Sequence, residues 1–61
     1  MEIDTMNKHM VGVRGDKIAM LVPPRGEMSK AEALVLAAWL VTLADDDGLA
    51  FGEVLRAVRE T

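Results

Sequence analysis

The residue types that could do chemistry in this chain are cations around one short loop. Arg25 and Lys30 flank Gly26 and Ser29, just before a long apolar stretch. The start of a helix presents free backbone N–H groups and the positive end of the helix dipole, which suit a phosphate or carboxylate. We therefore predict an anion site here. The alternative is a plain capping box, in which Ser29 and Glu32 satisfy those amides and both cations are solvated.

A second pair of cations is predicted to lie at the tip of a β-hairpin. Two β-type runs, residues 9–14 and 17–22, are separated by a Gly-Asp pair, which is typical of a type II′ turn with a positive φ at the glycine. This turn places Arg14 opposite Lys17, where like charges are mildly destabilising. A bound anion would relieve them, and so would the neighbouring Asp16 or exposure to solvent.

The other reactive residue types lack the partners that catalysis or metal binding needs. His9 has no cysteine and no second histidine to act with, and Ser29 is predicted to be a helix cap. The acids at residues 45–47 are consecutive, whereas a calcium loop needs them at alternating positions. They predict a solvated turn that caps the following helix, with Gly48 in a conformation that other residues resist. We expect no catalytic residue, no metal and no cofactor.

The element that must position the loop is a helix over residues 28–44. It begins at a capping box and continues as a nearly unbroken apolar run. A helix that is apolar on all sides must be buried on all sides, and 61 residues without cysteine form too small a core to bury it alone. We therefore predict a homodimer or higher homo-oligomer. Its predicted interface residues are Leu36, Trp39, Leu40, Leu43, Met10 and Leu21.

The hairpin and a second helix complete the predicted fold. One face of the hairpin is apolar and should pack on the helix; it comprises Val11, Val13, Ile18, Met20 and Val22. The opposite face, with Gly12 across from Ala19, is flat and has open edges. An apolar stripe at helical spacing predicts an amphipathic helix over residues 49–59. The predicted class is α+β with the order ββαα, as one domain at residues 9–61 behind a flexible tail at residues 1–8.

Charge and hydropathy restrict the partners. The net charge of −3 argues against a nucleic-acid-binding protein. Five cations face four acids in residues 1–30, whereas two face six in residues 31–61, so an anion site belongs in the first half. The apolar helix is shorter than the roughly 20 residues that cross a bilayer, and the acidic N-terminus is unlike a signal peptide. We expect a soluble cytoplasmic protein that binds neither nucleic acid nor membrane.

The stretch Val-Pro-Pro-Arg-Gly-Glu-Met-Ser-Lys-Ala-Glu-Ala-Leu-Val-Leu-Ala-Ala-Trp-Leu-Val-Thr-Leu-Ala-Asp at residues 22–45 resembles a group of short proteins of actinobacterial phages, of the mycobacteriophage type. The resemblance extends to the hairpin and the closing amphipathic segment. It implies the cytoplasm of an infected bacterium as the setting and carries over no catalytic residue.

Small phage proteins of this kind often bind host components or blunt host defence, and by that analogy we expect a binding protein. The expected ligand is a small anionic, nucleotide-type host signal, sequestered in a pocket between subunits. The alternative is an inhibitor or modulator that binds a host protein through the hairpin face or an edge strand.

Overall fold

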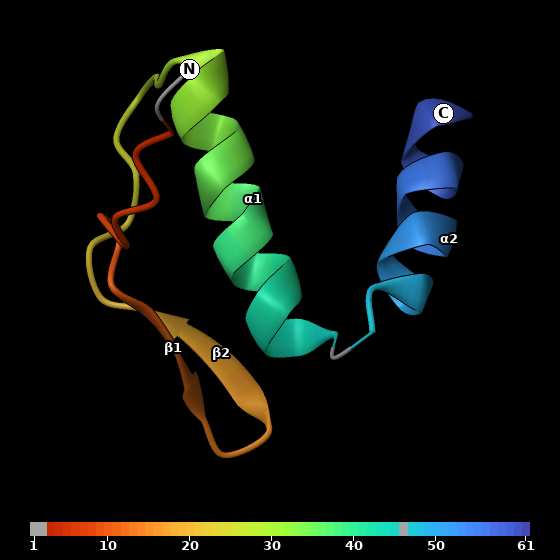
Figure 1. Ribbon diagram of the computed structural model, residues 1–61, viewed down its shortest axis with the longest axis horizontal. Coiled ribbons are helices and arrows are strands. Elements are labelled where there is room, and N and C mark those ends of the chain that lie inside the picture. Colours follow the sequence, from red (N-terminus) through yellow and green to blue (C-terminus); the bar gives the residue numbers. More distant parts are fainter. Residues whose placement is uncertain (1–2, 46) are drawn as a thin grey trace.

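A β-hairpin followed by two helices makes up the chain (Figure 1). The computed structural model describes residues 3–45 and 47–61. Strand β1 spans Val11–Arg14, β2 spans Lys17–Met20, helix α1 spans Lys30–Ala44 and α2 spans Leu49–Arg59. The predicted α+β class and the ββαα order are therefore confirmed.

The hairpin has the predicted register. Its antiparallel pairs run from Val11 opposite Met20 to Arg14 opposite Lys17. In the turn, Gly15 has a φ of +65°, whereas Asp16 does not have a positive φ. A type II′ turn needs a positive φ at its first central residue only, so both the register and the turn follow from the Gly-Asp pair.

Both strands are two residues shorter at the open end of the hairpin than the apolar runs predicted. Strand β1 begins at Val11 instead of residue 9, and β2 ends at Met20 instead of residue 22. Met10 has a φ of +49°, which ends the extended backbone of β1. Its carbonyl still accepts the N–H of Leu21 at 3.4 Å, but its own N–H donates to the carbonyl of Asn7 at 3.1 Å and closes a turn. Beyond this turn the N-terminal segment, residues 3–9, runs back alongside α1 (Figure 1).

Helix α1 packs against both strands. Only part of the predicted packing face is covered, because Val13, Ile18 and Val22 are exposed. Val11 on that face is 6% exposed and is the one buried residue in the described part of the chain. Its cross-strand partner Met20 is half-buried. None of the 15 residues of α1 is buried, however. None of the described helices combines the length and apolar composition that crossing a bilayer requires.

Helix α2 stands apart from the hairpin, beyond α1, and is joined to α1 by a short turn (Figure 1). Its first turn is capped from that turn, as predicted. Asp47 accepts the N–H of Leu49 at 3.0 Å, and Asp45 accepts the N–H of Phe51 at 2.8 Å. Gly48 has a φ of +77°, the left-handed conformation expected of it. Residue 46, also part of the predicted acidic turn, lies outside the described residues.

Candidate functional site

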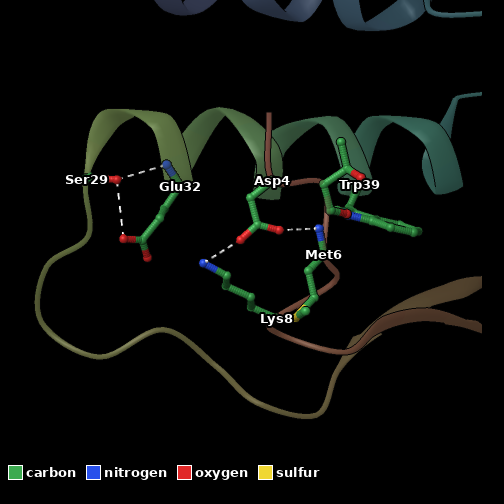
Figure 2. A network of polar contacts seen from close by, with 7 residues as sticks. Asp4, Met6, Lys8, Ser29, Glu32 and Trp39 are labelled. Carbon is green, nitrogen blue, oxygen red and sulfur yellow. Dashed lines mark hydrogen bonds and ion pairs between the residues drawn. The ribbon is translucent and has the colours of Figure 1, made fainter. Parts of the chain in front are cut away.

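The loop before α1 has the local geometry that the capping box predicted, with one difference. The hydroxyl of Ser29 accepts the N–H of Glu32 at 3.0 Å. The carboxylate of Glu32 was predicted to accept the N–H of Ser29, but it accepts the Ser29 hydroxyl at 3.3 Å instead (Figure 2). Gly26 has a φ of +58°. Both flanking cations, Arg25 and Lys30, are exposed.

The two parts of the predicted anion site do not meet within one chain. Arg14 and Lys17 face each other across the hairpin as predicted, and both are exposed. The hairpin turn lies at the opposite end of the molecule from the start of α1, where the loop with Arg25 and Lys30 arrives (Figure 1). A single ligand could contact all four cations only if two copies contributed to the site.

These four cations have no carboxylate partner among the described residues. The one ion pair in the described part of the chain joins Lys8 to Asp4 at 3.3 Å (Figure 2). Asp4 also accepts the N–H of Met6 at 3.0 Å. That hydrogen bond, followed by the Lys8 ammonium, lowers the pKa of the Asp4 carboxyl below its ordinary value. The positive charge at the loop and at the hairpin tip is therefore exposed to solvent.

An apolar cleft lies between the N-terminal segment and α1. It measures about 680 Å³, and its apolar walls include Ile3, Met6, Leu34, Val35 and Trp39. The indole N–H of Trp39 donates to the carbonyl of Thr5 at 2.9 Å and ties the N-terminal segment to α1. This cleft could not be predicted, because residues 3–8 show no periodicity. The flexible-tail interpretation of residues 1–8 stays a prediction.

A second apolar groove lies between α1 and α2. It measures about 370 Å³ and is lined on the α1 side by Ala37, Leu40, Val41 and Ala44. Phe51 and Val54 of the α2 stripe line the other side. The predicted amphipathic stripe of α2 thus faces α1 across a groove that the chain itself leaves open.

The predicted interface residues fall into two groups that differ in exposure. Those on α1 are half-buried within the chain: Leu36, Trp39, Leu40 and Leu43. Met10 and Leu21 are 55% and 68% exposed. The large hydrophobic residue of α1 that is exposed is Leu34, at 72%. Leu34 was not among the predicted interface residues, because an all-apolar helix has no polar face from which to orient it. The interface itself stays a prediction.

The remaining reactive side chains are engaged in structural hydrogen bonds. His9 donates through Nδ1 to the carbonyl of Val22 at 2.7 Å and helps to close the open end of the hairpin. Asp45 and Asp47 cap α2. Within residues 3–45 and 47–61, no three side chains of the metal-binding types gather in one place.

Comparison with known proteins places the chain in no family. No family model matches the sequence, and no curated protein or solved structure shows significant similarity to it.

Proposed function

We propose that this chain is a binding protein whose active form is a homo-oligomer. The observation that supports this is the accessible surface of the single chain, 5482 Å². A compact monomer of 6.6 kDa would expose about 3,900 Å². The radius of gyration, 12.5 Å, likewise exceeds the value of about 10.5 Å expected for 61 residues. About 1,600 Å² per chain is left for a partner to cover.

The nature of the exposed surface supports the same proposal. Large apolar side chains are exposed on every element, including Val13 in β1, Leu34 in α1 and Val54 in α2. A soluble monomer rarely exposes contiguous apolar patches of more than a few hundred square ångströms. The chain has no cysteine with which to staple such a small core. Self-association is the remaining means of covering this surface.

The ligand we propose for this oligomer is a small anionic molecule of the nucleotide type, bound between subunits. Four exposed cations without carboxylate partners among the described residues support it: Arg14, Lys17, Arg25 and Lys30. Hydrogen bonds to charged groups are each worth roughly 1.5–3 kcal/mol, so several together give useful affinity. The phage resemblance suggests that the ligand is a host defence signal and that binding sequesters it in the bacterial cytoplasm.

A titration calorimetry experiment tests this ligand class. The parent is titrated with cyclic dinucleotides, nucleotide mono- and diphosphates, and inorganic phosphate. Arg25→Ala should abolish the heat of binding and leave melting almost unchanged, because an exposed arginine contributes little to folding. Arg56→Ala removes a cation from α2 and should bind like the parent. No heat with any compound in the parent would remove the anionic ligand from the proposal.

The second candidate is a host protein bound to the outer hairpin face. The exposure of Met10 and Leu21, which lie next to the strands at the open end of the hairpin, favours it. Leu21→Glu should then abolish capture of one host protein by the immobilised chain. Arg59→Gln changes the net charge by the same amount on α2 and should retain it. Equal capture by both variants would contradict this candidate.

A further inference from the structure

We propose that β2 pairs along its outer edge with the β2 strand of a second copy of this chain. The two strands run antiparallel across a two-fold axis, so that two hairpins form one four-stranded sheet. This inference rests on the homo-oligomer proposed above and specifies the surface that builds it. It follows from a difference between the two edges of the hairpin.

The outer edge of β1 is partly closed by the chain itself. Because Met10 and Leu21 are hydrogen-bonded to each other, the pairs alternate so that the N–H and C=O groups of Val11 and Val13 point away from β2. The side chain of Asn7 forms hydrogen bonds with the outward-pointing groups of Val11. Its Oδ1 accepts the Val11 N–H and its Nδ2 donates to the Val11 carbonyl, both at 2.9 Å. A further strand could extend along this edge only by displacing Asn7.

The outer edge of β2 has no such cover in the described part of the chain. By the same alternation, the N–H and C=O groups of Ile18 and Met20 point outward, and no described residue forms a hydrogen bond with them. Edge groups left in this way are a template for another strand. A two-stranded sheet is marginal in water unless it gains further strands or packs against a helix. Helix α1 covers part of one face of this hairpin, and a second hairpin would add two strands at the open edge.

A two-fold axis at Ala19 uses all of these outward groups. Ile18 of each copy faces Met20 of the other, and each facing pair exchanges two hydrogen bonds. Ala19 faces its own counterpart in a non-hydrogen-bonded pair, where Cα atoms approach to about 4.5 Å and a small side chain fits. An axis at Ile18 would instead place Met20 opposite Asp16 in the turn and lose half of these bonds.

A second copy is the occupant that the surface area favours. The excess of about 1,600 Å² per chain amounts to about 3,200 Å² for a pair, within the range of obligate homodimers. Facing residues of an antiparallel pair point to the same side. The hairpin faces covered by α1 therefore join, and both copies of α1 lie on one side of the sheet, where their apolar surfaces can meet.

The same register joins the two parts of the predicted anion site. With the axis at Ala19, Lys17 of one copy faces Leu21 of the other. Leu21 lies four residues before Arg25, a span of at most about 14 Å of extended chain. The hairpin tip of one copy is thus placed beside the loop of the second copy. Within a single chain, the tip and the loop lie at opposite ends.

Cysteine cross-linking tests this register, because the chain has no cysteine of its own. In Ala19→Cys the two symmetric positions are about 4.5 Å apart between Cα atoms, within the disulfide range. The control is Gly12→Cys, which lies opposite Ala19 in the hairpin and whose added Cβ meets no atom within 4 Å. Its two copies would be three strand spacings apart, about 14 Å. Mild oxidation should form the covalent dimer at least ten-fold faster from Ala19→Cys.

Backbone methylation tests the edge hydrogen bonds without changing a side chain. Methylating the N–H of Ile18 in a synthetic chain removes an outward donor of β2. Methylating the N–H of Val13, which faces Ile18 in the hairpin, removes the equivalent donor of β1. Sedimentation should give a dimer Kd raised at least ten-fold for the methylated Ile18 chain and unchanged for the methylated Val13 chain.

The outcomes separate this inference from the proposed function. If the parent is a dimer, equal cross-linking of the two cysteine variants, or equal Kd values for the two methylated chains, would overturn the β2 pairing and leave the homo-oligomer in place. A parent that sediments as a folded monomer at low micromolar concentration would overturn both.

Discussion

The two helices of this chain have opposite sequence patterns, and neither is fully covered, although α1 has more half-buried residues than α2. Helix α1 is apolar around most of its circumference, whereas α2 has an apolar stripe and a polar face with Glu53, Arg56 and Arg59. No residue of either helix is buried in the single chain. An amphipathic helix can keep one face in water, but an all-apolar helix cannot. The need for a partner therefore comes mainly from α1, and α2 can lie at the periphery of the assembly.

The two helices also differ in how their first turns are capped. The side chain that caps α1 belongs to its own N-cap residue, Ser29. The N-cap of α2 is Gly48, which offers no side chain, so Asp45 and Asp47 at the end of α1 supply the acceptors. The start of α2 thus depends on the end of α1, whereas the start of α1 is independent of α2.

Truncating the aromatic residue of α1 should have the largest effect. If α1 is enclosed in the oligomer, Trp39→Ala should cost about 3–5 kcal/mol, as for a buried aromatic residue. It also removes the hydrogen bond to Thr5. Denaturant unfolding followed by circular dichroism measures the loss, and sedimentation should show the oligomer dissociating. The melting temperature of the parent should rise with protein concentration. A loss below about 1 kcal/mol would mean that α1 is not enclosed.

The matching truncation in α2 should cost less. Phe51 is 38% exposed and lines the open groove toward α1. Phe51→Ala should therefore cost about 1–2 kcal/mol, less than a fully buried side chain. The same unfolding measurement, at the same protein concentration, compares it with Trp39→Ala. Equal losses of stability would show that the oligomer encloses both helices and buries them to a similar degree.

Removing the α1 cap should have a smaller effect. Ser29→Ala removes the acceptor of the Glu32 N–H and should cost about 1 kcal/mol. Ser29→Asp keeps an acceptor and is the control, with stability close to that of the parent. Helix content and thermal melting measure both variants. If Ser29→Ala melts like the parent, tertiary contacts rather than the cap fix the start of α1.

Local signals in the sequence predicted most of the fold. The Gly-Asp turn fixed the hairpin register, and Ser29 with Glu32 located the start of α1. Neither the contact between Trp39 and the N-terminal segment nor the short strand ends could be predicted in this way. The first joins residues 34 positions apart through a backbone carbonyl, and the second follows from the left-handed backbone of Met10. The cations of the candidate site were recognisable as types, but their separation depends on the path between hairpin and helix.

The smallest expected effect concerns the N-terminal segment, which together with the hairpin covers part of α1 and has no counterpart on α2. The Met6 N–H and then Lys8 lower the pKa of Asp4. A carboxyl with a lowered pKa in the folded state contributes stability above its unfolded pKa, about 3.9. That contribution is lost as pH falls through the lower folded value, so it is complete at neutral pH. Because Asp4 is exposed, the contribution is small and weakened by salt.

Trp39 reports on this segment, since its indole holds the carbonyl of Thr5, next to Asp4. Fluorescence of this single tryptophan should show a small acid transition below about pH 4 in the parent. Asp4→Asn should lack the transition, and Asp16→Asn at the hairpin turn should keep it. A transition of the same size in Asp4→Asn would show that a different carboxyl group causes it.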